Sequence, residues 1–237
     1  MEKVIVALRR PDTDDEWVAR LCGPVAAALL DLDLPGVTLN LRDGAVRDSL
    51  MTLTTLDPPV QGFVSLWTQQ YYGTAMDEAL RILRAGADDI ADDIAAYLVT
   101  ESVPMPPPES PPGVRAPGMA NMALLRRPTE MDEQTWLRRW HHDHTPVAIA
   151  TQSTFGYVQN FVVRALTAGA PPLSAIVEEL FPIEAVGSLH AFFGAADDAE
   201  LGDRMNKMVA STAAFGANID VDTVPTGRYV FRNPFGP

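Results

Sequence analysis

The sequence Val-Ile-Val-Ala-Leu-Arg-Arg-Pro at residues 4–11 returns as Asn-Met-Ala-Leu-Leu-Arg-Arg-Pro at residues 121–128. In both places an apolar run typical of a strand ends in Leu-Arg-Arg-Pro. An acidic helix start with a tryptophan, Trp17 or Trp136, then follows. The two shared tetrapeptides lie 117 residues apart and the two tryptophans lie 119 apart. Markers that recur in the same order with nearly constant spacing indicate an internal duplication.

A third marker extends the match into the later part of each half. Ser-Leu-Trp at residues 65–67 and Ser-Leu-His at residues 188–190 close comparable apolar runs, 123 residues apart. His190 therefore takes the place of Trp67. We expect both side chains in the same layer, where His190 is either a second polar group of a cavity or an ordinary residue of a sheet.

A proline-rich segment separates the two halves. Residues 104–117 hold seven of the 20 prolines of the chain. Because proline lacks the backbone N–H and favours extended conformations, this segment should form neither a helix nor a central strand. We therefore predict a first unit at residues 1–103, a linker at 104–117 and a second unit at 118–237.

Hydrophobic periodicity predicts the same order of strands and helices in both halves. In the first half we expect strands near 3–10, 37–42, 60–68 and 94–103, with helices at 13–32 and 75–85. In the second half we expect strands at 119–126, 157–165, 186–193 and 227–232, with helices from about 131, at 174–180 and at 199–215. This order predicts an α+β protein of two tandem ferredoxin-like βαββαβ units. The bare faces of the two sheets should pack on each other and enclose a space for a ligand.

Composition limits the classes of partner. The chain has 237 residues, with 18 Lys and Arg against 31 Asp and Glu, and a formal net charge of −13. This charge would repel the phosphates of nucleic acids and of anionic lipid surfaces. The sequence shows neither a leader pattern nor an apolar run long enough for a membrane span. We therefore expect a cytoplasmic protein without a nucleic-acid or membrane partner, either a monomer or a homodimer.

Three of the four histidines lie within residues 141–144. Trp136, Trp140 and His144 follow one another at intervals of four residues, which places them on one buried helix face. Pro146 should open the helix beside His144, and we expect the His144 ring to reach the space enclosed by the two sheets. An imidazole in a semi-enclosed apolar space can serve as general acid or base, whereas a hydrogen-bonded core histidine is the plainer alternative. His141 and His144 also have helical spacing for a metal, but no His-Glu-x-x-His pattern accompanies them.

The strand that follows this helix carries polar groups on both faces. Tyr157 and Gln159 share one face, while Asn160 and Arg164 share the other. Whichever face meets the cavity brings a group that could orient a substrate carbonyl. Ordinary polar positions of an edge strand are the alternative.

The second half resembles the EthD-like branch of the dimeric α/β-barrel superfamily. The resemblance rests on Leu-Arg-Arg-Pro, the helix ending in Trp-His-His-Asp-His-Thr-Pro at 140–146, and Gly-Tyr-Val-Gln-Asn at 156–160. It covers about residues 119–233. The first half keeps the same order of strands and helices but has lost the segment that matches residues 143–145. It therefore resembles a degenerate copy of the same unit. The resemblance implies a fused barrel in one chain with a cavity for small, mostly apolar molecules.

These observations lead to three hypotheses. The first is an enzyme for a small apolar carbonyl or aromatic compound, without a cofactor or metal. In it His144 acts as acid or base with help from His141 or His190, and Tyr157, Asn160, Trp140 and Trp67 bind the substrate. The second is a non-catalytic protein that binds a small molecule. The third is a haem protein with a histidine axial ligand, because haem proteins occur in the same superfamily.

Overall fold

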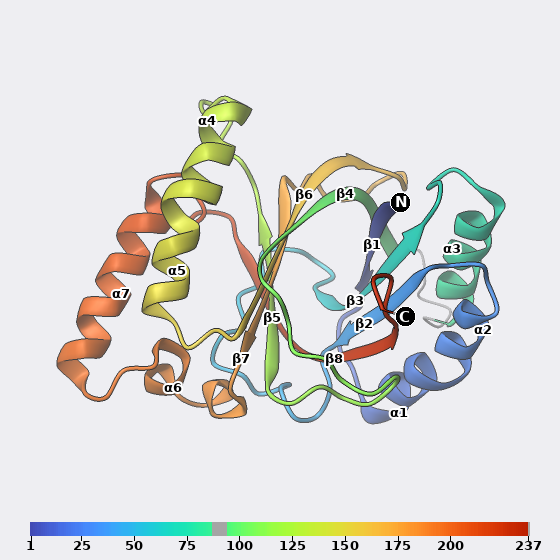
Figure 1. Ribbon diagram of the computed structural model, residues 1–237, viewed down its shortest axis with the longest axis horizontal. Coiled ribbons are helices and arrows are strands. Elements are labelled where there is room, and N and C mark those ends of the chain that lie inside the picture. The colour runs from blue at the N-terminus through green and yellow to red at the C-terminus, as the bar shows by residue number, and fades with distance from the viewer. Residues whose placement is uncertain (87–93, 237) are drawn as a thin grey trace.

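The computed structural model describes residues 1–86 and 94–236, in which eight strands close into one antiparallel barrel (Figure 1). Around the barrel the order is β1-β3-β2-β8-β5-β7-β6-β4, and every ladder is antiparallel. The strands are β1 (Glu2–Arg9), β2 (Gly36–Leu41), β3 (Val60–Thr68), β4 (Ile94–Met105), β5 (Met119–Leu125), β6 (Gly156–Ala165), β7 (Ala175–Phe181) and β8 (Asp222–Arg232). The sequence prediction of a barrel is therefore confirmed.

The first four strands and the last four are arranged alike. Their orders are β4-β1-β3-β2 and β8-β5-β7-β6. Two ladders, β2 with β8 and β4 with β6, join the sets at both edges. The two sheets therefore meet edge to edge and share one interior. An apolar cluster fills the middle of that interior with residues from both sets, among them Ile5, Phe63, Met122 and Ile176.

Helices cover the outside of the barrel in two layers, one at each end of the molecule in Figure 1. One layer holds α1 (Asp15–Arg20), the π-helical turn η1 (Leu21–Val25), α2 (Ala26–Leu30) and α3 (Thr74–Gly86). The other holds α4 (Glu133–Arg138), the π-helical turn η2 (Arg139–His144), α5 (Thr145–Thr151), α6 (Leu189–Phe193) and α7 (Asp198–Ala213), with a 3-10 turn, η3 (Ile183–Val186). Among the described residues, none of these helices combines the length and apolar character needed to cross a bilayer.

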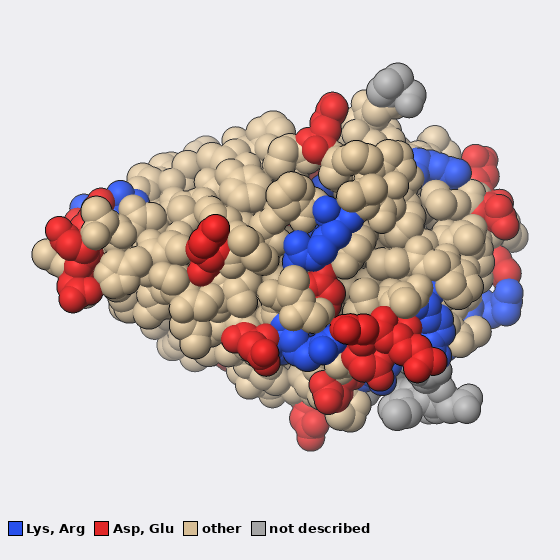
Figure 2. Space-filling model, turned by 90° about the horizontal axis from the view of Figure 1, so that it is seen from below, with Lys and Arg blue, Asp and Glu red and all other residues tan. Residues whose placement is uncertain are grey.

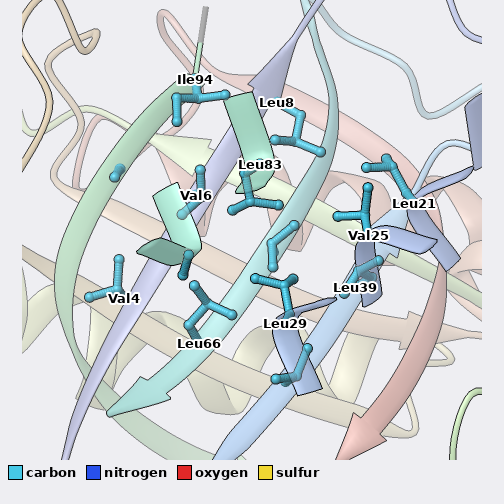
Figure 3. Packing of buried hydrophobic residues seen from close by; sticks show 14 of the residues in the cluster. Val4, Val6, Leu8, Leu21, Val25, Leu29, Leu39, Leu66, Leu83 and Ile94 are labelled. Carbon is cyan, nitrogen blue, oxygen red and sulfur yellow. The ribbon is translucent and has the colours of Figure 1, made fainter. Parts of the chain in front are cut away.

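Alternation along the strands separates the barrel interior from the helix layers. In β1, Ile5 belongs to the interior cluster, whereas Val4 and Val6 belong to the cluster under the helices. Figure 3 shows Val4 and Val6 packed with Leu29 and other aliphatic side chains of this first helix layer. Each strand residue therefore faces one of two separate compartments.

Both halves open their first helix at the same place. The π-helical turn η1 contains Pro24, and Pro146 follows η2 as the second residue of α5. A proline cannot donate the backbone hydrogen bond of a regular helix, so the wider turn accommodates it. The opening predicted beside His144 is present.

Two sequence predictions in the second half are wrong. Residues 174–180, expected as a helix, form β7, and residues 186–193, expected as a strand, end in α6. The adjacent Glu178 and Glu179 suggested a helix. In the strand, however, Glu178 faces the barrel interior and Glu179 faces the helices. Ser188 accepts a hydrogen bond from the backbone N–H of Ala191, which starts α6.

The proline-rich segment is bound to the barrel. Strand β4 continues to Met105, beyond the expected end at residue 103. The backbone N–H groups of Gly113 and Ala116 donate to the carbonyl groups of Val230 and Arg228, both at 2.8 Å. The segment therefore lies against β8 and covers one end of the barrel.

Candidate functional site

The structure distributes the seven candidate residues over three places. Trp67 and Asn160 face the barrel interior. Trp140, His144 and Tyr157 are buried between the helices and the barrel of the second half, and His141 is half-buried on the same turn as His144. His190 lies on α6, half-buried, with Nε2 3.0 Å from Oδ1 of Asp198.

The expected position of His144 is therefore corrected. We expected its ring to reach the space enclosed by the two sheets, but η2 lies outside the barrel wall. The expected match between His190 and Trp67 is corrected as well, because His190 is on a helix. The seven residues do not form one site, and their roles stay predictions.

His144 is held as a neutral, buried imidazole. Its side chain is 7% exposed, its Nδ1 lies 3.0 Å from Oγ of Ser211, and its ring packs on Phe215 with 4.9 Å between centroids. Burial lowers the pKa of His144 to about 4. At neutral pH the ring therefore carries no charge and interacts with its neighbours by hydrogen bonding and packing.

Three polar side chains lie in a row across β5, β7 and β6, on the face toward the helices. They are Asn121, Glu179 and Tyr157, and the strand register places Glu179 directly between the other two. Burial raises the pKa of Glu179 to about 8. Burial also raises the pKa of Tyr157, with a further contribution from the Glu179 carboxylate. We call these three residues the polar rung.

The polar rung is only partly satisfied by protein groups. Glu179 is 8% exposed and has no hydrogen-bond or ion-pair partner among the described residues, and the buried Oδ1 of Asn121 accepts no hydrogen bond from them. Beside Tyr157, Nε2 of Gln159 donates to Oγ1 of Thr145 at 2.8 Å. A buried carboxyl without a partner costs folding free energy, so such groups are uncommon outside functional sites.

The first half shows that the fold does not require this polarity. The corresponding row across β1, β3 and β2 consists of Val4, Leu66 and Val37, each fully buried. Aliphatic side chains thus fill the same positions in one half, while an amide, a carboxyl and a phenol fill them in the other. The difference marks the layer under η2 and α7 as the candidate active site.

Sequence reasoning missed Glu179 and Asn121. The available signal was a charged residue inside the buried run Ala-Ile-Val-Glu-Glu-Leu-Phe at 175–181 and an amide inside the apolar strand at 119–125. The run at 175–181 was interpreted as a helix, where Glu178 and Glu179 would both reach solvent. Only its pairing as a central strand places one glutamate on each face.

The barrel interior holds a separate cluster of charged and polar side chains near the start of β1. Nζ of Lys3 donates to Oδ1 of Asn160 at 2.8 Å and to the carboxylate of Glu101, and lies 4.6 Å from the centre of the Trp67 ring. Burial lowers the pKa of Lys3, and the Glu101 carboxylate opposes that shift. Asn160 therefore positions a lysine within the barrel.

A second ion pair lies beside the first. Oε1 of Glu178 accepts hydrogen bonds from Nε of Arg228 at 3.0 Å and from Nδ2 of Asn40 at 2.8 Å. Glu178 is satisfied by partners on two other strands, in contrast to Glu179. The two neighbouring glutamates therefore have opposite environments.

Neither cluster assembles a metal site. Among residues 1–86 and 94–236, no group of three or more His, Cys, Asp or Glu side chains could hold a metal ion.

On the face drawn in Figure 2, the Lys and Arg side chains lie beside Asp and Glu, so the described part of that face has no continuous basic surface.

The fold defines an α/β protein built on a closed eight-stranded antiparallel barrel. No family model and no curated protein matches the sequence. Among solved structures, the chain is similar to an anthrone oxidase-like protein, with a TM-score of 0.56 and 12% identity over 99% of this chain and 95% of that one. A dye-decolorizing protein from V. cholerae matches with a TM-score of 0.40 and 9% identity over 98% and 94% of the two chains. The first similarity shows the shared barrel fold alone.

Proposed function

We propose that the protein is an enzyme for a small apolar carbonyl or aromatic compound, and that it transfers a proton in the helix layer of the second half. The single observation that carries this proposal is the buried carboxyl of Glu179, which has no partner among the described residues and is paired in the strand register with Tyr157. A pKa of about 8 lies close to neutral pH, which suits a general acid or base. The aliphatic row of the first half supports a functional reason for these groups.

In this proposal each residue has a distinct role. The Glu179 carboxylate removes a proton from a carbon that is next to the substrate carbonyl or conjugated with it through an aromatic ring, and becomes a carboxylic acid. The electron pair of the broken C–H bond moves to the carbonyl oxygen, which accepts a hydrogen bond from the Tyr157 hydroxyl. Trp140 contributes apolar surface, and neutral His144, fixed by Ser211, positions the substrate. Return of the proton from Glu179 completes an isomerisation or exchange.

We further propose that the chain is a tandem duplication of an EthD-like unit, with residues 1–103 and 118–237 as its two copies. The like order of strands, the π-helical turn beside a proline in each half, and the repeated Leu-Arg-Arg-Pro support this proposal. In it the first copy completes the barrel, and the second carries the polar rung.

Two other functions stay predictions. A non-catalytic protein would bind the same compounds without moving a proton. In a haem protein, Nε2 of His144 would be the axial ligand, because Nδ1 forms a hydrogen bond with Oγ of Ser211. A Soret band after addition of haem, lost in His144→Ala, would identify that function.

Hydrogen–deuterium exchange at a carbon acid tests the proposed reaction. Anthrone, chosen from the name of the similar structure, is a suitable probe because its methylene group is conjugated through the aromatic rings with the ketone carbonyl, so the electron pair left by the proton can reach the carbonyl oxygen. We expect the protein to accelerate exchange in D₂O, with a rate that rises as the pH passes through about 8. Glu179→Gln should lower the rate by about 100-fold and Tyr157→Phe by about tenfold.

The exposed Glu133 on α4 offers a matched control, and Glu133→Gln should leave the rate unchanged. Exchange by Glu179→Gln at the rate of the unsubstituted protein would remove Glu179 from the mechanism. Binding of anthrone without any acceleration of exchange would favour the non-catalytic alternative.

A further inference from the structure

A cavity of about 670 Å³ lies at the end of the barrel where β1 begins, separate from the polar rung. Its walls include Lys3, Trp67 and Arg228 from the barrel interior. The proline-rich segment from Pro106 to Pro112 and the chain end from Val230 to Gly236 also line it. The volume is within the range of pockets for small organic molecules.

Arg228 presents unused hydrogen-bond donors to this cavity. Its Nε donates to Glu178, but neither terminal nitrogen has a hydrogen-bond partner among the described residues. The side chain is 14% exposed, so solvent reaches it only in part. A guanidinium with two free parallel donors matches the two oxygens of a carboxylate.

Thr38 adds a second unsatisfied group. It lies on β2 beside β8, lines the same cavity and is 2% exposed, and its hydroxyl has no hydrogen-bond partner among the described residues. A buried hydroxyl without a partner is unfavourable unless a ligand or water completes it. Thr38 and Arg228 thus lie on adjacent strands at the cavity wall, each with a donor that no described residue uses.

The other walls combine apolar surfaces with three carboxylates, of which Glu101 and Glu178 are already paired with Lys3 and Arg228, while Glu109 belongs to the proline-rich segment. The Trp67 ring lies under Nζ of Lys3, and Pro106, Pro107 and Pro108 stand among the cavity residues. Lys3 is already paired with Glu101, and Arg232 is occupied by backbone carbonyl groups of α2 and the following turn. The spare donors are therefore concentrated at Arg228 and Thr38, in a cavity whose Trp67 and proline surfaces suit a planar hydrocarbon.

We propose that this cavity binds a small organic carboxylate with a flat apolar body. The carboxylate accepts hydrogen bonds from the terminal nitrogens of Arg228 and from the hydroxyl of Thr38. The apolar body packs against Trp67 and the prolines. The proline-rich segment is in this view the cover of a binding site as well as the connection between the halves.

Calorimetric titration with 2-naphthoate tests the proposal, with 2-naphthamide and 2-naphthylmethylamine as neutral and cationic analogues. We expect naphthoate to bind at least tenfold more tightly than either analogue and to shift the indole N–H resonance of Trp67. Arg228→Lys keeps the positive charge but loses the two parallel N–H donors of the guanidinium, and should weaken binding by about tenfold or more. Thr38→Val should weaken binding by about fivefold without loss of stability.

Thr13→Val is the matched control. Thr13 is likewise buried with an unpartnered hydroxyl, but it does not line the cavity, so naphthoate affinity should not change. Glu179→Gln should also bind naphthoate as before, which separates this site from the proposed reaction. Equal affinity for the three compounds, unchanged affinity in Thr38→Val, or loss of binding in Glu179→Gln would each overturn the proposal.

Discussion

Glu179→Leu is expected to stabilise the protein while it removes the proposed activity. Burial raises the pKa of Glu179 from 4.5 to about 8. Between these values the unfolded chain has released the proton of this group and the folded protein has kept it, so rising pH favours unfolding. The wild-type protein should therefore lose about 3 kcal/mol of stability between pH 5 and pH 8 through this group alone.

Leucine at position 179 cannot ionise, and Leu66 fills the corresponding position of the first half. We expect the variant to be more stable than wild type by about 3 kcal/mol at pH 7, and we expect that gain to shrink toward pH 5. Urea denaturation at several pH values measures both effects. A destabilised variant, or parallel pH profiles for the two proteins, would show that Glu179 is not a strained, neutral carboxyl.

The neighbouring residue provides the control. Glu178→Leu removes a carboxylate that accepts hydrogen bonds from Arg228 and Asn40, and it leaves the guanidinium without its ion-pair partner inside the barrel. Breaking a buried ion pair costs about 3–5 kcal/mol. The same substitution at adjacent positions should thus change stability in opposite directions. The strand propensity of leucine alone would change both variants in the same direction.

His144→Gln is expected to make the fold less sensitive to acid. Burial lowers the pKa of His144 from 6.5 to about 4. As the pH falls from 6.5 to 4, the unfolded chain binds a proton at this position and the folded protein does not, so stability is lost. We expect wild type to lose about 3 kcal/mol over this interval through His144, and the glutamine variant to avoid that loss.

Thermal unfolding at pH 7 and pH 4 compares the two proteins. Glutamine can keep a hydrogen bond to Ser211, so the difference at pH 7 should be small. His142→Gln, an exposed position of the same turn, should follow wild type at both pH values. Equal acid sensitivity of His144→Gln and wild type would mean that His144 is not the buried neutral imidazole described above.

The sequence located most of the barrel strands along the chain but not the compartments around them. The paired Leu-Arg-Arg-Pro motifs located β1 and β5, and the apolar run at 60–68 located β3. The strand β7 was missed because Glu178 and Glu179 suggest a solvated helix. Their separation by the barrel wall depends on pairing with distant strands.

The candidate site was predicted only in part. The helix pattern correctly placed Trp140 and His144 among buried residues. Alternation showed that Tyr157 and Asn160 face opposite ways, yet it could not say which of them faces the helices. That choice is made by closure of the barrel, which turns Tyr157 outward to Trp140 and Asn160 inward to Lys3.

The ladders of β2 with β8 and β4 with β6 have a consequence for how the two halves can change. In a barrel assembled from two identical chains, every substitution appears twice. A polar group that is needed in one helix layer is therefore also buried in the other, where it lowers stability. A single chain is free of that symmetry. Its first half can be optimised for cohesion and its second for the proposed reaction, and random mutation should accordingly impair folding from either half but alter the proposed activity chiefly from the second.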